Sequence, residues 1–130
     1  MSHFSRIKTS IYDLDILKKT LIDLGFTYKS DQSFIQDANG NSQKVDIIAY
    51  QMINLSKGIC GFTWNGCEYS LITDLEFWNQ NISIEVFIEK LMQYYALNSI
   101  MKESIHEGFQ KINQETMQDG SIKLVIQRWN

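Results

Sequence analysis

The sequence lacks proline and contains only two cysteines and two histidines among its 130 residues. Its longest apolar runs are a few residues, whereas a helix that spans a bilayer needs roughly 20. It also lacks the apolar core of a secretory signal. We therefore expect neither a transmembrane segment nor a secretory signal. The alternating pattern from Phe4 to Thr9 predicts an N-terminal strand rather than a transit peptide.

Clustered positive charge is also missing. Twelve Lys and Arg residues stand against fifteen Asp and Glu residues, which gives a formal net charge of −3 and a pI of about 5.3. Proteins dedicated to nucleic acids neutralise phosphates with clustered Lys and Arg. The composition therefore argues against a dedicated nucleic-acid binder, and no nucleic-acid partner is expected.

Candidate metal ligands are few and scattered. His3, His106, Cys60 and Cys67 form neither a Cys-x-x-Cys pair nor a paired-histidine motif. Two cysteines are too few for a typical iron–sulfur cluster, which uses four thiolates. The glycines match neither a P-loop nor a dinucleotide-binding fingerprint. We therefore expect no metal and no cofactor, and the sequence identifies no catalytic residue.

The composition that is present is typical of one globular domain. Hydrophobic residues make up 44% and charged residues 21% of the 15.2 kDa chain. Single domains commonly contain roughly 100–200 residues, so we expect a single domain over residues 1–130. Ile, Asn and Lys, whose codons are AT-rich, number 18, 9 and 10, against 3 Ala and 2 Arg. This skew indicates an AT-rich genome rather than selection for a function.

Two helices are predicted from apolar residues at spacings of three and four. The first lies between a candidate N-cap, Asp13, and a helix-ending glycine, Gly25. The second covers residues 84–107 and follows another candidate N-cap, Ser83. It is either one long helix or two helices with a bend near Asn98.

Three hairpins are predicted from Asn-Gly and Asp-Gly turn sequences between extended segments. They turn at Asn39-Gly40, Asn65-Gly66 and Asp119-Gly120. The first turn is expected to join a strand over residues 33–36 to a single strand over residues 44–51. The last has either a two-residue loop or a three-residue loop with a left-handed glycine. Together these elements predict an α+β fold: an antiparallel sheet built from three hairpins, with two helices packed on one face.

The two cysteines flank the Asn65-Gly66 turn. A two-residue turn would pair Trp64 with Cys67 and Leu71 with Cys60, so the cysteines would be offset along the hairpin. That offset does not suit the Cα separation of roughly 4.4–6.8 Å that a disulfide needs. Both cysteines are therefore predicted to be small core residues with free thiols, as in a reducing compartment.

The remaining candidate functional residues are mostly aromatic or adjacent to an aromatic residue. Trp, Tyr and Arg are enriched at protein interfaces, where they contribute much of the binding energy. As an alternative, Trp78 is an apolar anchor that pins its loop, and Trp129 belongs to a docked C-terminal strand. The candidate surface or interface residues are His3, Trp64, Asn65, Trp78, Arg128 and Trp129.

Several segments form a pattern that extends over almost the whole chain. They are Met1–Thr9, Leu24–Phe26, Gly61–Gly66 with Tyr69, Tyr95-Ala96, Gly108-Phe109, Asp119–Ile122 and Gln127–Trp129. In this order they resemble the hypothetical chloroplast reading frame thirty-five family of plastids and cyanobacteria. The resemblance implies a plastid-encoded protein that needs no transit peptide, or a cytoplasmic one if the source is a cyanobacterium. It carries no catalytic or binding residues over to this chain.

Three functional hypotheses follow. The first is a non-catalytic interaction or assembly factor in the chloroplast stroma, with one or more protein partners. The second is a small enzyme or ligand-binding protein with a cleft near His3, Trp64 and Arg128. The third is RNA binding through aromatic residues on an open sheet face, which the acidic composition disfavours.

Overall fold

The computed structural model describes residues 4–31, 33–37, 39–51, 54–78 and 80–128. The chain divides into two compact units, Met1–Tyr95 and Ala96–Asn130. The boundary between them falls within helix α2 (Ile84–His106). Each unit is described by itself, and a single domain over residues 1–130 stays a prediction.

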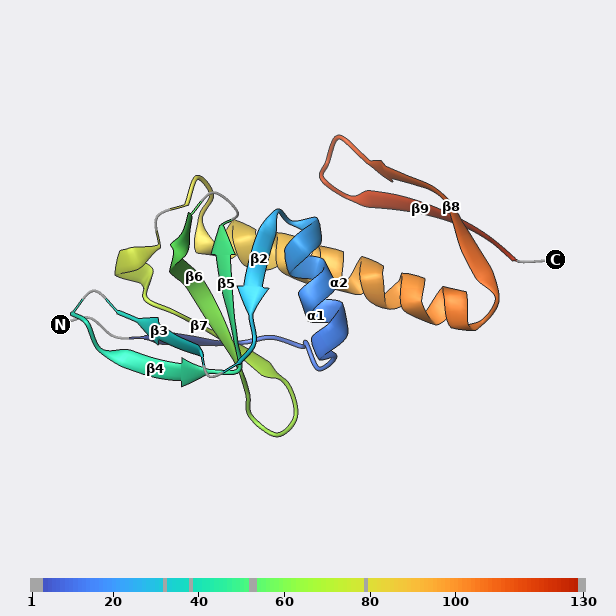
Figure 1. The fold of residues 1–130 in the computed structure, drawn as a ribbon. Helices are drawn as coiled ribbons and strands as arrows, with labels where there is room; N and C mark the ends of the chain where they lie inside the picture. Colours follow the sequence, from blue (N-terminus) through green and yellow to red (C-terminus); the bar gives the residue numbers. More distant parts are fainter. Residues whose placement is uncertain (1–3, 32, 38, 52–53, 79, 129–130) are drawn as a thin grey trace. The chain divides into compact units, whose positions relative to one another are not determined.

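The first unit is built on a five-stranded antiparallel sheet (Figure 1). Its strands lie in the order β1-β7-β6-β5-β2, so strands that are distant in sequence become neighbours. The pairing of β1 with β7 confirms the strand expected at the N-terminus. The five strands are β1 (Ser5–Lys8), β2 (Phe26–Lys29), β5 (Ile47–Gln51), β6 (Asn54–Trp64) and β7 (Tyr69–Thr73).

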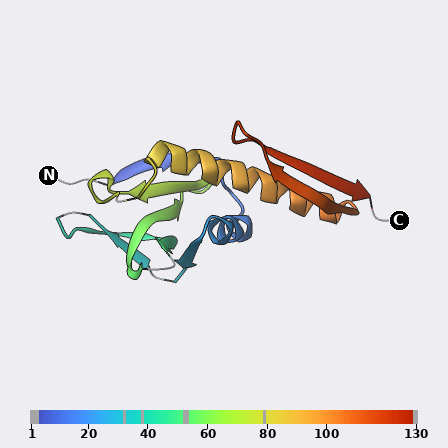
Figure 2. The same cartoon turned by 90° about the horizontal axis from the view of Figure 1, so that it is seen from above.

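Helix α1 (Leu14–Asp23) begins and ends at the residues expected from the sequence. The carboxylate of its N-cap, Asp13, accepts a hydrogen bond from the backbone N–H of Ile16 at 3.1 Å. After the helix, Gly25 adopts a φ of 90°, which glycine tolerates because it has no Cβ. Figures 1 and 2 show α1 beside β2, the strand that follows it in the chain.

The hydrophobic core lies mainly between the sheet and the helices. Alternate side chains of the central strands, including Phe62 and Leu71, form one cluster with Leu17 of α1 and Phe87 and Leu91 of α2. Both helices therefore pack on the same face of the sheet, as the sequence predicts. On the opposite face, a smaller cluster contains Ile35, Val45, Ile48 and Ile72. The period of two along each strand separates the two sets.

The α+β class is confirmed, but the sheet layout differs from the prediction. Of the three predicted hairpins, only β6–β7 joins the five-stranded sheet. The other two form two-stranded sheets within the described residues: β3 (Ser33–Gln36) with β4 (Ser42–Val45), and β8 (Phe109–Thr116) with β9 (Ile122–Arg128).

Asp46 is the residue at which the layout departs from the prediction. It separates β4 from β5, and its backbone N–H donates to the carbonyl of Phe62 at 2.9 Å. The segment before Asp46 pairs with β3, whereas the segment after it pairs with β2 and β6. One predicted strand thus becomes two strands in different sheets.

Helix α2 is one continuous helix, which decides between the two alternatives left open by the sequence (Figures 1 and 2). Its start is capped as predicted, because the hydroxyl of Ser83 accepts a hydrogen bond from the backbone N–H of Val86 at 3.2 Å. The 3-10 helix η1 (Leu75–Phe77) precedes it. Neither α2 nor any other helix in the described ranges has the length and apolar character needed to cross a membrane.

The loop between β8 and β9 matches the three-residue alternative. The backbone N–H of Met117 donates to the carbonyl of Ser121 at 2.7 Å and closes a loop of three residues. Gly120 adopts a φ of 89°, the left-handed conformation expected for its position. The side chain of Asp119 accepts hydrogen bonds from the N–H and hydroxyl of Ser121, which lower the pKa of this carboxyl.

The register predicted for the β6–β7 hairpin is wrong by two residues. Trp64 pairs with Tyr69, rather than with Cys67, across a four-residue loop. The side-chain oxygen of Asn65 accepts hydrogen bonds from the N–H groups of Cys67 and Glu68, each at 2.9 Å, and holds these residues in the loop. Cys67 is therefore exposed, so its predicted place in the core is also wrong, whereas Cys60 is buried as predicted.

We expect only one of the two thiols to react in the native protein. Burial raises the pKa of the Cys60 thiol far above its ordinary value, whereas Cys67 is exposed. Ellman's reagent should titrate one thiol in native buffer and two in guanidinium chloride. The control variant Cys67→Ser should show no rapid reaction when native. Rapid reaction of both wild-type thiols in native buffer would contradict this assignment.

Candidate functional site

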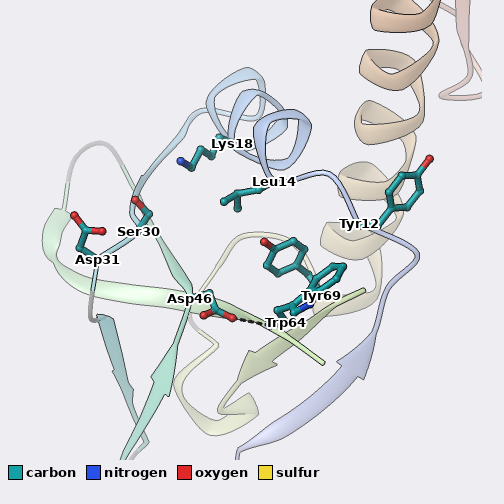
Figure 3. A pocket seen from close by; sticks show the side chains of 8 residues that line it. All are labelled: Tyr12, Leu14, Lys18, Ser30, Asp31, Asp46, Trp64 and Tyr69. Atoms are coloured by element: carbon teal, nitrogen blue, oxygen red, sulfur yellow. Dashed lines mark hydrogen bonds between the residues drawn. The ribbon is translucent and has the colours of Figure 1, made fainter. Parts of the chain in front are cut away.

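The candidate site is a pocket at the end of the β6–β7 hairpin (Figure 3). Its volume is about 620 Å³. Four separate segments of the first unit contribute side chains to it, and both charged and aromatic groups are present. The lining residues are Tyr12, Leu14, Lys18, Ser30, Asp31, Asp46, Trp64 and Tyr69.

Trp64 and Tyr69 form an aromatic pair in this pocket. Because they are the last paired residues of the hairpin, their side chains lie on the same face of the sheet. Their ring centroids are 5.0 Å apart, with a tilt of 58° between the ring planes. Trp64 is 44% exposed, whereas Tyr69 is 8% exposed. The pair thus joins an accessible indole to a phenol that is held by the core.

Asp46 links the aromatic pair to the strand junction described above. Its Oδ2 atom accepts a hydrogen bond from the backbone N–H of Trp64 at 2.6 Å (Figure 3). Hydrogen bonds to an ionised carboxylate are shorter and stronger than bonds between neutral groups. This contact fixes both the carboxylate and the backbone of Trp64 in the pocket.

The segment before α1 forms another side of the pocket. The backbone carbonyl of Ile11 accepts a hydrogen bond from the N–H of Tyr69 at 2.7 Å. The phenol oxygen of Tyr95 on α2 accepts hydrogen bonds from the N–H groups of Tyr12 and Asp13, at 3.3 and 3.1 Å. These contacts hold the segment that carries Tyr12 and Leu14 against strand β7 and helix α2.

The pocket carries more negative than positive charge. It is lined by two carboxylates, Asp31 and Asp46, and by one ammonium group, that of Lys18. The ammonium group lies 5.5 Å from the centre of the Tyr28 ring, within cation–π distance. Burial raises the pKa of the Tyr69 hydroxyl, and the charges of Asp46 and Asp13 raise it further. The hydroxyl is therefore neutral near pH 7.

Of the residues that the sequence proposed for a site, Trp64 and Asn65 lie close together in the first unit. Trp64 lies in the pocket, and Asn65 lies in the adjacent loop, where its side-chain oxygen holds the turn. Arg128 belongs to the second unit and stacks on Phe109, with 4.6 Å between its guanidinium carbon and the ring centre. His3 and Trp129 lie outside the described residues.

Trp78 is held by contacts within the first unit. Its indole N–H donates to the carbonyl of Ile82 at 2.9 Å, and its ring packs edge-on against Phe87 at 5.1 Å between centroids. The tryptophan thus connects the segment before α2 to the core. These contacts match the alternative of an anchor that pins a loop, while an interface role for Trp78 stays a prediction.

Sequence reasoning missed seven of the eight pocket residues, since only Trp64 was proposed. One local signal was present at Asp46, a charged residue within the otherwise apolar run Val45–Ala49. A carboxylate in such a run indicates either a break in the strand or a functional site. The other residues carry no comparable signal, because they come together only through the tertiary fold.

The described residues offer no cluster of three or more His, Cys, Asp or Glu side chains that suits a metal ion. The pocket offers a ligand three kinds of contact: charge, hydrogen bonding and stacking on an aromatic ring. Trp64, Tyr69 and Asp46 supply these three kinds of contact.

Comparison with known proteins connects the chain to one family. Residues 20–125 match the family described as "Protein of unknown function (DUF1257)". None of the solved structures matches the chain.

Three relatives extend the match over almost the full chain, and each is described as "Uncharacterized protein ycf35". The protein from Pyropia yezoensis is 48% identical over 130 residues, which cover 100% of this chain and 99% of that protein. The one from Guillardia theta is 42% identical, and the one from Cyanophora paradoxa is 39% identical; each match covers 99% of this chain and 98% of the relative.

These matches confirm the resemblance to the hypothetical chloroplast reading frame thirty-five family, and with it the plastid as the location that the relatives imply. The chain therefore belongs to the DUF1257 family, together with the ycf35 proteins of algal plastids.

Proposed function

We propose that this chain is a non-catalytic interaction or assembly factor of the plastid stroma, and that its pocket receives part of a partner protein. The observation that carries the proposal is Trp64, a half-exposed indole at a preformed pocket. Tyr69 supports the ring of Trp64, and Asp46 holds its backbone. Tryptophan and tyrosine in such settings dominate the energetics of many interfaces.

The packing of Trp64 against Tyr69 supports a binding role. A side chain that is already ordered before binding loses less conformational entropy when the complex forms. The stromal location rests on the plastid relatives and on a composition typical of globular proteins. We expect no nucleic-acid partner, because the net charge of −3 does not favour contact with phosphates.

Trp64→Ala should weaken capture of the partner. A tagged chain is used as bait in algal plastid extract, and the retained proteins are quantified by mass spectrometry. Removing an interface tryptophan of this kind costs at least about 2 kcal/mol, or about 30-fold in affinity. Phe34→Ala is the matched control, because Phe34 is an exposed aromatic residue outside the pocket.

The two outcomes of this capture experiment are distinct. A protein retained by the wild-type chain and by Phe34→Ala, but lost with Trp64→Ala, supports the proposal. The proposal fails if repeated captures return no specific partner, or if Trp64→Ala retains the same proteins in the same amounts.

A second candidate function is binding of a small molecule, as an enzyme or as a carrier. The pocket volume of about 620 Å³ favours it, because ligand pockets commonly measure roughly 300–1,000 Å³. Trp64 lines this pocket, and Arg128 belongs to the second unit. Native mass spectrometry of protein isolated from plastids tests this function, since a bound metabolite would appear as a mass increment that Trp64→Ala lacks.

A further inference from the structure

Tyr69 presents its hydroxyl to the pocket. The residue is more than nine-tenths buried, yet its hydroxyl is directed into the space beside Leu14 and Asp46 (Figure 3). The backbone of Tyr69 is bonded to Ile11 and Thr9, but its hydroxyl has no hydrogen-bond partner among the residues that the structure describes. Because no buried side-chain polar atom of the described residues lacks a partner, this hydroxyl is reached by solvent and is available to a ligand that enters the pocket.

The charges around that hydroxyl favour a cation. Two carboxylates and one ammonium group line the pocket, which leaves a net charge of −1 on its walls. The whole first unit contains 8 basic and 11 acidic residues, a difference of −3 that accounts for the net charge of the chain. Asp46 and Asp13 both act on Tyr69 electrostatically, so the hydroxyl lies in a region of negative potential.

Asp46 retains the capacity to bind a ligand. Its Oδ2 atom is occupied by the N–H of Trp64, whereas Oδ1 has no hydrogen-bond partner within the described part of the chain. A carboxylate has about four lone-pair positions and accepts two parallel bonds from a guanidinium group. The N–H of Trp64 leaves most of these positions available.

The indole of Trp64 adds a stacking surface beside this carboxylate. Guanidinium groups stack on aromatic faces and donate hydrogen bonds in their own plane, whereas an ammonium group is more strongly hydrated. An indole, a carboxylate and a phenol hydroxyl together match the stacking and hydrogen-bonding capacity of an arginine side chain.

We propose that the pocket recognises an arginine side chain of the partner protein, with the guanidinium group stacked on Trp64 and hydrogen-bonded to Asp46 and Tyr69. This inference rests on the proposed function, since it specifies what the partner inserts. Lys18 limits the affinity, because its like charge lies on the pocket wall.

The test is a titration followed by ¹⁵N NMR, with the Trp64 indole N–H as reporter. The probe is acetyl-Ala-Arg-Ala-amide, and the matched neutral probe is acetyl-Ala-Gln-Ala-amide. We expect the arginine peptide to shift the Trp64 signal with a Kd on the order of 1 mM, because a single side chain contributes only a small binding free energy. The glutamine peptide should bind at least tenfold more weakly.

Three pocket variants sharpen the test. Asp46→Asn keeps an acceptor for the Trp64 N–H but removes the charge, and Tyr69→Phe keeps the ring but removes the hydroxyl. Each should weaken binding of the arginine peptide by about threefold or more. Lys18→Gln should strengthen binding by about twofold at low salt, a gain that structural damage does not produce. Asp119→Asn, in the second unit, should leave the Kd unchanged.

Equal binding of the arginine and glutamine peptides, or an unchanged Kd in Asp46→Asn, would overturn the inference. If Trp64→Ala still abolishes partner capture in that case, the proposed function stands and only the arginine contact fails. If the pocket binds the arginine peptide but plastid extract yields no partner, the claim that the arginine belongs to a partner protein is refuted. The proposed function then fails as well.

Discussion

Replacing Phe87 with alanine is expected to lower the free energy of unfolding by about 3–5 kcal/mol. Phe87 is 2% exposed and lies in the main core cluster. It packs edge-on against Phe26 and Trp78, with centroid distances of 5.5 and 5.1 Å. Alanine removes both aromatic contacts and leaves a cavity between α2, β2 and the loop of Trp78.

Urea denaturation, followed by circular dichroism at 222 nm and by tryptophan fluorescence, measures this effect. Val86→Ala is the matched control, because Val86 precedes Phe87 on the same helix turn but lies at the surface. Its free energy of unfolding should change by less than about 1 kcal/mol. A loss no greater in Phe87→Ala than in Val86→Ala would show that the cluster is not packed as described.

The second large effect is expected at Gly61 on the opposite face of the sheet. A Cβ atom at this position would lie 2.6 Å from Cγ1 and 2.9 Å from both Cβ and Cγ2 of Val45. Because Val45 is buried and β-branched, it has little room to turn away. Gly61→Ala should therefore lower the free energy of unfolding by about 1–3 kcal/mol through overpacking.

A double-mutant cycle with Val45→Ala tests the cause. Val45→Ala is destabilising by itself, but it removes the two γ carbons near the new methyl group. The double variant should therefore lose less stability than the sum of the two single variants, by about 1 kcal/mol or more. Strict additivity of the two losses would show that the side chain of Val45 is not the obstacle.

The ends of the helices were predictable because capping depends on near neighbours. Asp13 bonds to a residue three positions along, and so does Ser83. The glycines after α1 and α2, Gly25 and Gly108, both have positive φ. Such signals are contained in a few consecutive residues, and the sequence displays them directly.

The register of the β6–β7 hairpin could not be predicted from neighbouring residues alone. The Asn-Gly pair marks the turn correctly, but the side chain of Asn65 accepts two backbone hydrogen bonds and enlarges the loop. Since the register changed by two residues, the strand faces were still predicted correctly. The same change placed Trp64 opposite Tyr69, and this pairing created the aromatic pair of the pocket.

The sequence by itself determined the α+β class, the helix boundaries, the positions of the turns and the family. The division of one predicted strand at Asp46, and the pocket, depended on the tertiary structure. The physical reason is the separation of the interacting groups along the chain. Trp64 and Asp46 bond across 18 positions, and Thr9 and Tyr69 across 60. Contacts at such separations arise from packing of the whole first unit. Apart from the charge of Asp46 within its apolar run, they leave no pattern in neighbouring residues.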